Sequence, residues 1–216
     1  MKELKDISGY RYAGESLSCA HAYLLPAVTT ELAECFSQRA DDGERRVFDL
    51  GCGNGSVAAY LAGLGYEVTG VDPSAEGIEQ ANRAHRELRL EPGSAYDDLH
   101  SLYGEFPAVI SLEVVEHVYA PRDYAATLFS LVEPGGVAIV STPYHGYLKN
   151  LALAAAGAMD RHYTALWDHG HIKFWSMATL SELLKDAGFG RIRFLRVGRI
   201  PMLAKSMIAV ASKPTE

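Results

Sequence analysis

The loop Asp49-Leu-Gly-Cys-Gly-Asn-Gly-Ser56 is the feature that most limits what this chain can fold into. An apolar stretch from Arg46 to Gly51 leads into it and predicts a strand, and a helical pattern follows it up to Gly65. Glycines between a strand and a helix let a ligand lie against the backbone and the helix N-terminus. The loop therefore predicts an α/β fold with a ligand site at the carboxyl ends of its strands.

The rest of the chain continues this alternation of strands and helices. Further strands are predicted at residues 66–71, 107–112 and 137–141, and helices at 75–88, 122–132 and 176–187. Two last strands, 191–197 and 205–211, have no helix-length segment between them and should form an antiparallel hairpin. No repeat or linker divides the chain, so we expect residues 1–216 to form a single domain.

The composition excludes several classes of protein. Apolar residues make up 48% of 216 residues, which is enough for a sizeable core. The longest stretch that resembles a membrane span, Leu151 to Met159, falls well short of the roughly twenty residues that a span needs. The charged N-terminus does not resemble a signal peptide, and the three cysteines include no CxxC pair, so a cytoplasmic location is expected.

Charge is distributed unevenly along the chain. The net charge of −7 disfavours nucleic acid as a partner. Residues 1–148 carry a net −12, however, and residues 149–216 a net +5, so the C-terminal third could meet something anionic. Arg191, Arg193 and Arg196 are expected on a solvated strand face, whereas Arg199 could reach an acidic substrate.

Two carboxylates indicate which ligand the glycine loop suits. A dinucleotide site would require GxGxxG, but Ser56 stands in place of the third glycine. Asp49 would repel a pyrophosphate and attract a cation, and S-adenosylmethionine carries an ammonium and a sulfonium but no phosphate. Asp72, at the end of the second strand, can accept hydrogen bonds from both ribose hydroxyls of an adenosine.

Four motifs together resemble a known family. They are Val47 to Gly55, Val71 to Ser74, Ser111 to Val118 and Leu131 to Gly136. With them the chain resembles class I S-adenosylmethionine-dependent methyltransferases over roughly residues 45–212. It looks most like the ubiquinone-biosynthesis O-methyltransferase branch, because Glu-Val-Val-Glu-His is followed by Ser-Thr-Pro-Tyr, an apolar insertion and a His-rich segment.

The resemblance implies both a fold and a cofactor site. The fold is a Rossmann-like, doubly wound, mostly parallel seven-stranded sheet with an antiparallel C-terminal hairpin and helices on both faces. The residues implied at the methionine end and the sulfur of S-adenosylmethionine are Asp49, Gly51, Gly53, Asn54, Leu112 and Glu113. Those implied at the ribose and adenine are Asp72, Pro73, Ser74, Ala95, Tyr96 and Asp97, with Ser94 standing where an Asp is common.

Histidines are the candidate catalytic residues. Methyl transfer from a sulfonium is an in-line displacement that needs alignment and at most one base. His117 follows the fourth strand and should lie near the methyl group, although it could instead be a helix-start histidine satisfied by backbone. His169 and His171 alternate on an extended segment and, with Trp167, Trp175 and Tyr144, form either a pocket wall or a packing loop.

Glu113, Glu116 and His117 raise the question of a metal. If residues 113–117 were helical, the three side chains would share one face and could hold a divalent cation, as some relatives of this branch do. If Glu113 belonged to the strand, the trio would be broken, and a further ligand would have to come from His145, His169 or His171. The expectation is that no metal is bound and that His117 acts alone or merely packs.

Residues 1–25 and 144–175 are expected to form lids over the site, because long insertions in compact domains are usually functional. A helix within 144–160 could also rest weakly on a membrane surface, as the resemblance implies. The expected activity is methyl transfer to a small molecule, on oxygen first, with nitrogen or carbon as alternatives. A nicotinamide-dependent oxidoreductase is the alternative from another class, and the oligomeric state is left open.

Overall fold

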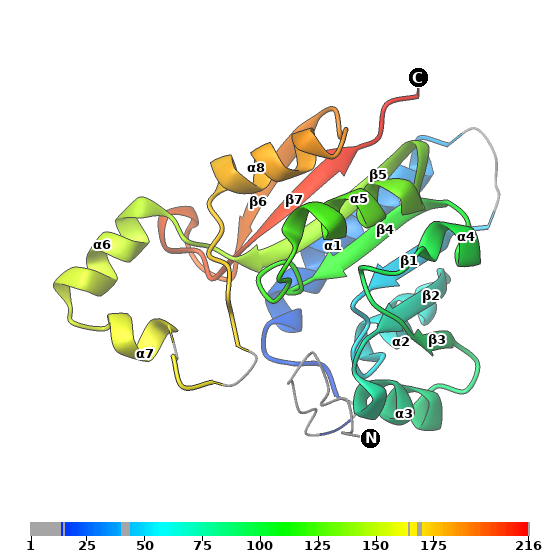
Figure 1. The fold of residues 1–216 in the computed structure, drawn as a ribbon, viewed down its shortest axis with the longest axis horizontal. Coiled ribbons are helices and arrows are strands. Elements are labelled where there is room, and N and C mark those ends of the chain that lie inside the picture. Colours follow the sequence, from blue (N-terminus) through cyan, green and yellow to red (C-terminus); the bar gives the residue numbers. More distant parts are fainter. Residues whose placement is uncertain (1–13, 15, 40–43, 164, 168–169, 216) are drawn as a thin grey trace.

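The computed structural model describes residues 14, 16–39, 44–163, 165–167 and 170–215. Their strands form one seven-stranded sheet in the order β3-β2-β1-β4-β5-β7-β6 (Figure 1). The first five in this order are parallel to one another, and β7 is antiparallel to both β5 and β6, which confirms the predicted fold. The strands are β1 (Arg46–Leu50), β2 (Glu67–Asp72), β3 (Arg89–Pro92), β4 (Phe106–Leu112), β5 (Val132–Pro143), β6 (Ile192–Val197) and β7 (Ser206–Ser212).

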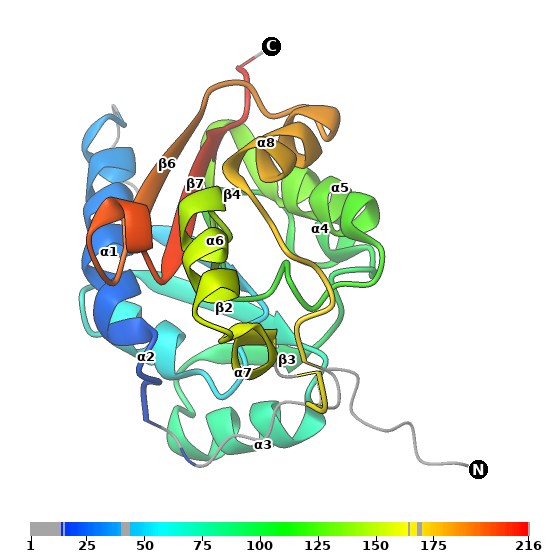
Figure 2. The same cartoon turned by 90° about the vertical axis from the view of Figure 1, so that its left-hand side faces the viewer.

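Helices cover both faces of the sheet (Figure 2). One core lies beneath the helices that follow β3, β4 and the insertion, and contains Tyr124, Leu128 and Leu180; the other lies beneath the first three helices and contains Leu24, Leu61 and Ile78. The helices are α1 (His21–Ser37), α2 (Ser56–Ala62), α3 (Ala75–Ala84), α4 (Leu99–Tyr103), α5 (Pro121–Leu131), α6 (Tyr147–Ala155), α7 (Met159–Tyr163) and α8 (Met177–Asp186), with a 3-10 turn η1 (Pro201–Leu203).

The central strands were predictable because they are buried on both faces. Every residue of β4 is buried, so its sequence is a continuous apolar run rather than an alternating one. The short elements β3 and α4 were not located from sequence. In β3 only Leu90 is buried, so the strand has no apolar run to reveal it. β5 starts at Val132, earlier than predicted, because Pro134, Gly135 and Gly136 belong to the strand.

An ion pair joins α1 to the edge strand β6. The Arg193 guanidinium donates hydrogen bonds to both oxygens of Glu31, one of them at 2.6 Å. Glu31 is buried on the inner face of α1, whereas Arg193 is 40% exposed. Arg193, expected on a solvated face, is thus partly exposed and also paired, and the sequence gives no sign of its buried partner on a helix 162 positions away.

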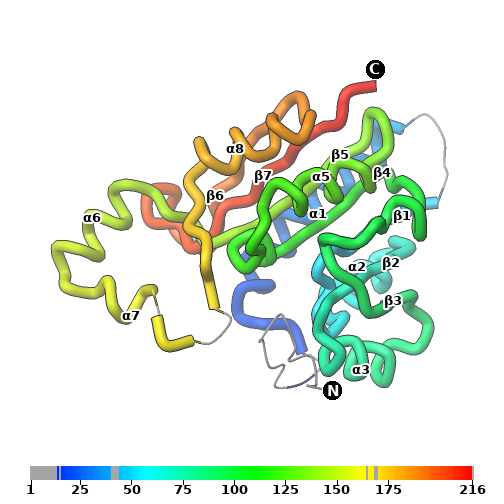
Figure 3. The backbone as a smooth tube through the Cα atoms, in the orientation of Figure 1, coloured from blue at the N-terminus to red at the C-terminus, as the bar shows by residue number. Residues whose placement is uncertain are grey.

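Helices α6 and α7 extend away from the sheet beyond the end of β5 (Figures 1 and 3). The predicted helix near residue 148 is present, but α6 has no buried residue, and Tyr147 and Leu151 are exposed. No helix in the described part of the chain has the length and apolarity needed to cross a membrane. Contact of 144–160 with a membrane surface stays a prediction.

Candidate active site

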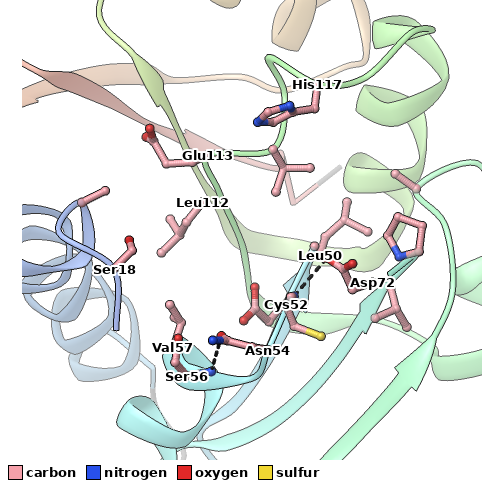
Figure 4. Close-up of a pocket in the computed structure, with 18 of the residues that line it drawn as sticks. Ser18, Leu50, Cys52, Asn54, Ser56, Val57, Asp72, Leu112, Glu113 and His117 are labelled. Carbon is pink, nitrogen blue, oxygen red and sulfur yellow. Dashed lines mark hydrogen bonds between the residues drawn. The ribbon is translucent and has the colours of Figure 1, made fainter. Parts of the chain in front are cut away.

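A cleft of about 450 Å³ opens at the carboxyl ends of β1, β2 and β4 (Figure 4). The glycine loop and Asp72 form its floor, residues 93–96 after β3 form one side, and residues 112–118 after β4 form another. Residues 16–21 at the start of α1, together with Trp167 and His171 from the insertion, complete the wall. Segments from six parts of the chain thus meet at the site that the glycine loop predicted.

Asp72 fixes the shape of the glycine loop. Its Oδ2 accepts the N–H of Gly53 at 3.0 Å and its Oδ1 accepts the N–H of Ser74 at 2.8 Å. Gly55 has a φ of +75°, and a Cβ there would lie 2.7 Å from Leu90 Cδ1, so only glycine fits between the loop and α3. The carboxylate that could bind a ribose therefore also holds the loop beneath it.

Asp49 is a buried carboxylate that lacks a partner. It is 2% exposed, and its Oδ2 has no hydrogen-bond partner among the described residues. Burial, followed by the charge of Asp72, raises the pKa of Asp49 to about 7. A cation in the cleft would favour the ionised form and supply the missing partner, which fits the ammonium of S-adenosylmethionine.

Asn54 connects the glycine loop to the N-terminal segment. Its Nδ2 donates to the carbonyl of Gly14 at 2.7 Å, and its Oδ1 accepts the N–H of Ser56 at 3.2 Å. Ser18 and His21, which also line the cleft, were not singled out from sequence. The only signal for them was the expectation that residues 1–25 cover the site.

A cluster of two imidazoles and one carboxylate lies at the side of the cleft opposite the glycine loop, which we call the acceptor side. The rings of His117 and His171 are 4.9 Å apart between centroids, and the Trp167 ring lies 5.3 Å from His171. Ligand atoms of Glu116, His117 and His171 all lie within 4.8 Å of one another. Both carboxylate oxygens of Glu116 are buried without a hydrogen-bond partner among the described residues. These three residues are therefore brought together by β4 and the insertion.

The electrostatics of this cluster favour neutral groups. Burial lowers the pKa of His171 to about 4, with the neighbouring imidazoles of His117, His145 and His162 adding to the effect. Burial, and then the charge of Glu113, raises the pKa of Glu116 well above its usual range. A neutral imidazole beside an unpartnered carboxylate is a donor set that suits a divalent cation.

Glu113 is turned away from this cluster. It follows the last residue of β4 with a φ of +57°, and its carboxylate points away from the His117 ring (Figure 4). Ser141 Oγ donates to its Oε1 at 2.8 Å, and Ser206 Oγ to its Oε2 at 3.4 Å. The trio of Glu113, Glu116 and His117 is thus broken, as expected for the alternative in which Glu113 stays with the strand, and His171 lies where a third ligand would be.

Most of the residues predicted at the cofactor line the cleft, but two do not. Ser74 instead caps α3 by accepting the N–H of Gly77, and Asp97 accepts the N–H of Ser94 at 2.7 Å in a turn.

His169 lies outside the described residues. Trp175 and Tyr144, expected in a pocket wall, belong to the core beneath α8. The residues predicted to line the cleft that do so are Asp49, Gly51, Gly53, Asn54, Asp72, Pro73, Ala95, Tyr96, Leu112, Glu113, His117, Trp167 and His171.

A sequence model of the methyltransferase domain matches residues 21–192. The chain belongs to the methyltransferase family. This methyltransferase is 40% identical over 126 residues to a ubiquinone biosynthesis O-methyltransferase of Caulobacter sp. (strain K31), covering 56% of the chain and 48% of that relative. It is 32% identical over 176 residues to the same-named protein of Roseobacter denitrificans, covering 76% and 69%. The chain spans about half the length of the Caulobacter relative.

Solved methyltransferases share the fold. A magnesium protoporphyrin IX methyltransferase of Synechocystis PCC 6803 with bound S-adenosylhomocysteine superposes with a TM-score of 0.64 at 22% identity, covering 87% of this chain and 82% of that one. The methyltransferase domain of a bacterial Hen1 gives 0.64 at 23% identity, covering 88% and 97%. The expected methyltransferase class and branch are confirmed, and the family match does not support the nicotinamide-dependent alternative. The expected cofactor, S-adenosylmethionine, is supported by the Synechocystis enzyme, which was solved with it and with its demethylated product bound.

Proposed function

We propose that this enzyme transfers a methyl group from S-adenosylmethionine to a hydroxyl oxygen of a small-molecule acceptor. The observation that carries the proposal is the cluster of Glu116, His117 and His171 at the side of the cleft opposite the glycine loop. Hydroxyl acceptors must lose a proton during transfer, and His117, which lines the cleft beside His171, is placed to act on that proton, with the buried Glu116 behind it. Similarity to O-methyltransferases supports the choice of oxygen.

In this proposal the cofactor lies along the floor of the cleft. Asp49 binds the ammonium, because its unpartnered oxygen is buried in the cleft and gains a cation there. Asp72 binds the ribose hydroxyls while it continues to hold Gly53. Tyr96 and Ala95 lie beside the adenine, and Leu112 and Glu113 border the sulfur.

The cluster also fits a divalent cation, held by Glu116, His117 and His171. The fit rests on the two carboxylate oxygens of Glu116, which are buried without a hydrogen-bond partner among the described residues, and whose burial raises the pKa of this carboxyl. His171 is too weak a base to accept the hydroxyl proton efficiently, yet it is neutral and therefore ready to act as a ligand. When bound, such an ion lowers the pKa of an acceptor hydroxyl. His117 acting alone as the base is the alternative.

Transfer of labelled methyl from S-adenosylmethionine to a panel of catechols, aromatic amines and carbon nucleophiles tests the proposal. Mass spectrometry should locate the label on oxygen and only in catechols. His117→Ala should lose at least about 100-fold in kcat, the scale of a proton-transfer residue, while it binds S-adenosylhomocysteine as the wild type does. His100→Ala is the matched control, because His100 is exposed and bonds Ser130 instead. Labelled nitrogen or carbon with no labelled oxygen would reject the proposal.

A further inference from the structure

A second cavity of about 430 Å³ lies between the end of β5, α6, α7 and the connection from β6 to β7. All but one of its lining residues come from the positively charged C-terminal third of the chain. Three basic side chains line it, namely Lys149, Arg199 and Lys205, together with His162, and among the described residues no carboxylate does. Its other walls are apolar: Pro143, Ala152, Leu153, Leu203 and Ala204.

The positive charges in this cavity are not paired with a carboxylate in the part of the chain that the structure describes. Among the described residues, none of the three basic side chains forms an ion pair. Lys149 donates to the carbonyl of Tyr144 at 2.8 Å, and Lys205 lies 5.2 Å from the ring of Tyr23. Burial, and then the charge of Arg199, lowers the pKa of Lys149. Lys149 is half-buried while Arg199 and Lys205 are exposed, and like charges gathered around one cavity favour an anion between them.

His162 supplies an independent observation. Its Nε2 is buried and has no hydrogen-bond partner among the described residues. Burial, and then the charge of Lys149, lowers the pKa of this imidazole, so it is neutral at pH 7 and retains one N–H to donate. A buried polar atom without a partner is costly unless a ligand or water supplies one.

The cavity is separated from the cofactor cleft by the paired ends of β5 and β7. Pro143, in the cavity wall, pairs with Ser206, and Ser206 Oγ donates to Glu113, which lines the cleft. Lys205, the residue before Ser206, faces the cavity. The charge of Glu113 raises the pKa of Lys149 and so opposes the lowering that Arg199 causes. The cleft and the cavity therefore share the paired ends of β5 and β7 as a common boundary.

We propose that the cavity binds an acidic group, a carboxylate or phosphate, of the methyl acceptor, through Lys149, Arg199, Lys205 and His162. This inference rests on the proposed function. The apolar part of the wall contacts the carbon frame next to the acid. The acceptor is therefore an acid whose hydroxyl lies in the cleft and whose anionic end lies across the β5 and β7 ends.

The test compares 3,4-dihydroxybenzoate with neutral catechol as acceptors. The wild type should have a KM for the acid at least about tenfold below that for catechol, the effect of one charge-assisted hydrogen bond. Lys149→Met and Arg199→Met should remove this preference and leave the KM for catechol unchanged. Arg196→Met is the control, because Arg196 is an exposed basic residue on β6 that does not line the cavity.

A binding measurement separates this inference from the proposed function. Benzoate and inorganic phosphate are titrated into the protein while the His162 imidazole signal, assigned with His162→Gln, is followed by NMR. A saturable shift that is lost in Arg199→Met supports the anion site even if no acceptor is methylated, an outcome that would reject the proposed function alone. Equal KM values for acid and catechol, with no shift of His162, would overturn the inference.

The headgroup of an anionic lipid is the other source of an acidic group that would suit this cavity. Exposed apolar residues, including Leu151, Ile200 and Met202, surround the cavity on α6 and η1. Cosedimentation with phosphatidylglycerol vesicles, compared with phosphatidylcholine vesicles, measures this directly. Vesicle binding that depends on Lys149 and Arg199, without any preference for the acidic acceptor, would also overturn the inference.

Discussion

The Arg193 guanidinium binds the Glu31 carboxylate through both terminal nitrogens and so joins edge strand β6 to helix α1. Arg193→Met leaves Glu31 buried without its cation, and we expect the free energy of unfolding to fall by about 2 kcal/mol. This is below the usual cost for a fully buried pair because Arg193 is 40% exposed. Urea unfolding measures the change. Glu31→Gln in the same background should restore part of it, and a loss no larger than that of Arg196→Met would contradict the expectation.

Replacing Asp72 should weaken cofactor binding. Asp72→Ala removes the proposed ribose contacts and the acceptor of the Gly53 N–H, so we expect S-adenosylhomocysteine to bind more weakly by about 1.5 to 3 kcal/mol. Isothermal titration calorimetry measures this. Asp97→Ala is the control, because Asp97 is exposed and outside the cleft lining. Unchanged affinity in Asp72→Ala would exclude a role of this carboxylate in binding.

Cofactor affinity should depend on pH through Asp49. The pKa of Asp49 is raised to about 7 in the free protein, so below pH 7 the carboxyl must lose a proton before it binds an ammonium. Affinity should therefore rise from pH 5.5 towards pH 7 and level off above it. Calorimetry in buffers of different ionisation enthalpy should count the released proton, and Asp49→Asn should show neither the slope nor the release.

The same carboxyl should make the free protein less stable as the pH rises. Because the folded-state pKa of Asp49 lies above its value in the unfolded chain, near 4, the folded state holds the extra proton between these pH values. Its contribution to stability is present below about pH 4 and is lost as the pH rises to 7. Thermal unfolding of the wild type and of Asp49→Asn across this range isolates the contribution, and parallel pH profiles would contradict it.

Chelation should distinguish the two proposals for the acceptor side. If Glu116, His117 and His171 hold a divalent cation, exhaustive dialysis against EDTA should abolish transfer to catechols, and readded Mg²⁺ or Mn²⁺ should restore it. His171→Ala should then raise the cation concentration needed for half-maximal activity, while S-adenosylhomocysteine still binds. Full activity after chelation would leave His117 as the base and end the metal proposal.

Hydrogen exchange tests the predicted lids. Residues 16–25 and 144–163 should gain protection when S-adenosylhomocysteine and an acceptor are both bound, because transfer requires water to be excluded after the acceptor enters. The contact between Asn54 and Gly14 gives the N-terminal lid an anchor that Asn54→Ala removes. Equal protection of both segments with and without ligands would rule out closure.

The floor of the site was predictable from sequence, because strand, glycine loop, helix and acid follow one another within 27 residues, from Arg46 to Asp72. The reason for each of these residues, steric for the glycines and electrostatic for the carboxylates, lies in neighbours that are close in the sequence. The acceptor side was only partly predictable. His171 reaches His117 because the backbone N–H groups of Ile172 and Lys173 both donate to the carbonyl of Glu116, a contact across more than 50 residues that no spacing reveals.

The conformation of Glu113 illustrates why the rest could not be predicted. Whether this residue joined a helical cluster or stayed with β4 depended on two serines, Ser141 and Ser206, which come from strands far away in the sequence. Their hydroxyls donate hydrogen bonds to its carboxylate. The backbone of Glu113 has a left-handed conformation, which a glutamate rarely adopts. Likewise, Arg193 was assigned to solvent because its buried partner lies on another element.

The helix that buries nothing has an evolutionary consequence. Because α6 adds no side chain to either core, residues near it can be replaced, lengthened or exchanged between paralogues without weakening the sheet that holds the methyl donor. If the proposed anion site is correct, drift in α6 would alter the choice of acceptor while the glycine loop and its carboxylates keep their packing. A gene duplicate would then have a short route to a new acceptor, through a helix that contributes to neither core.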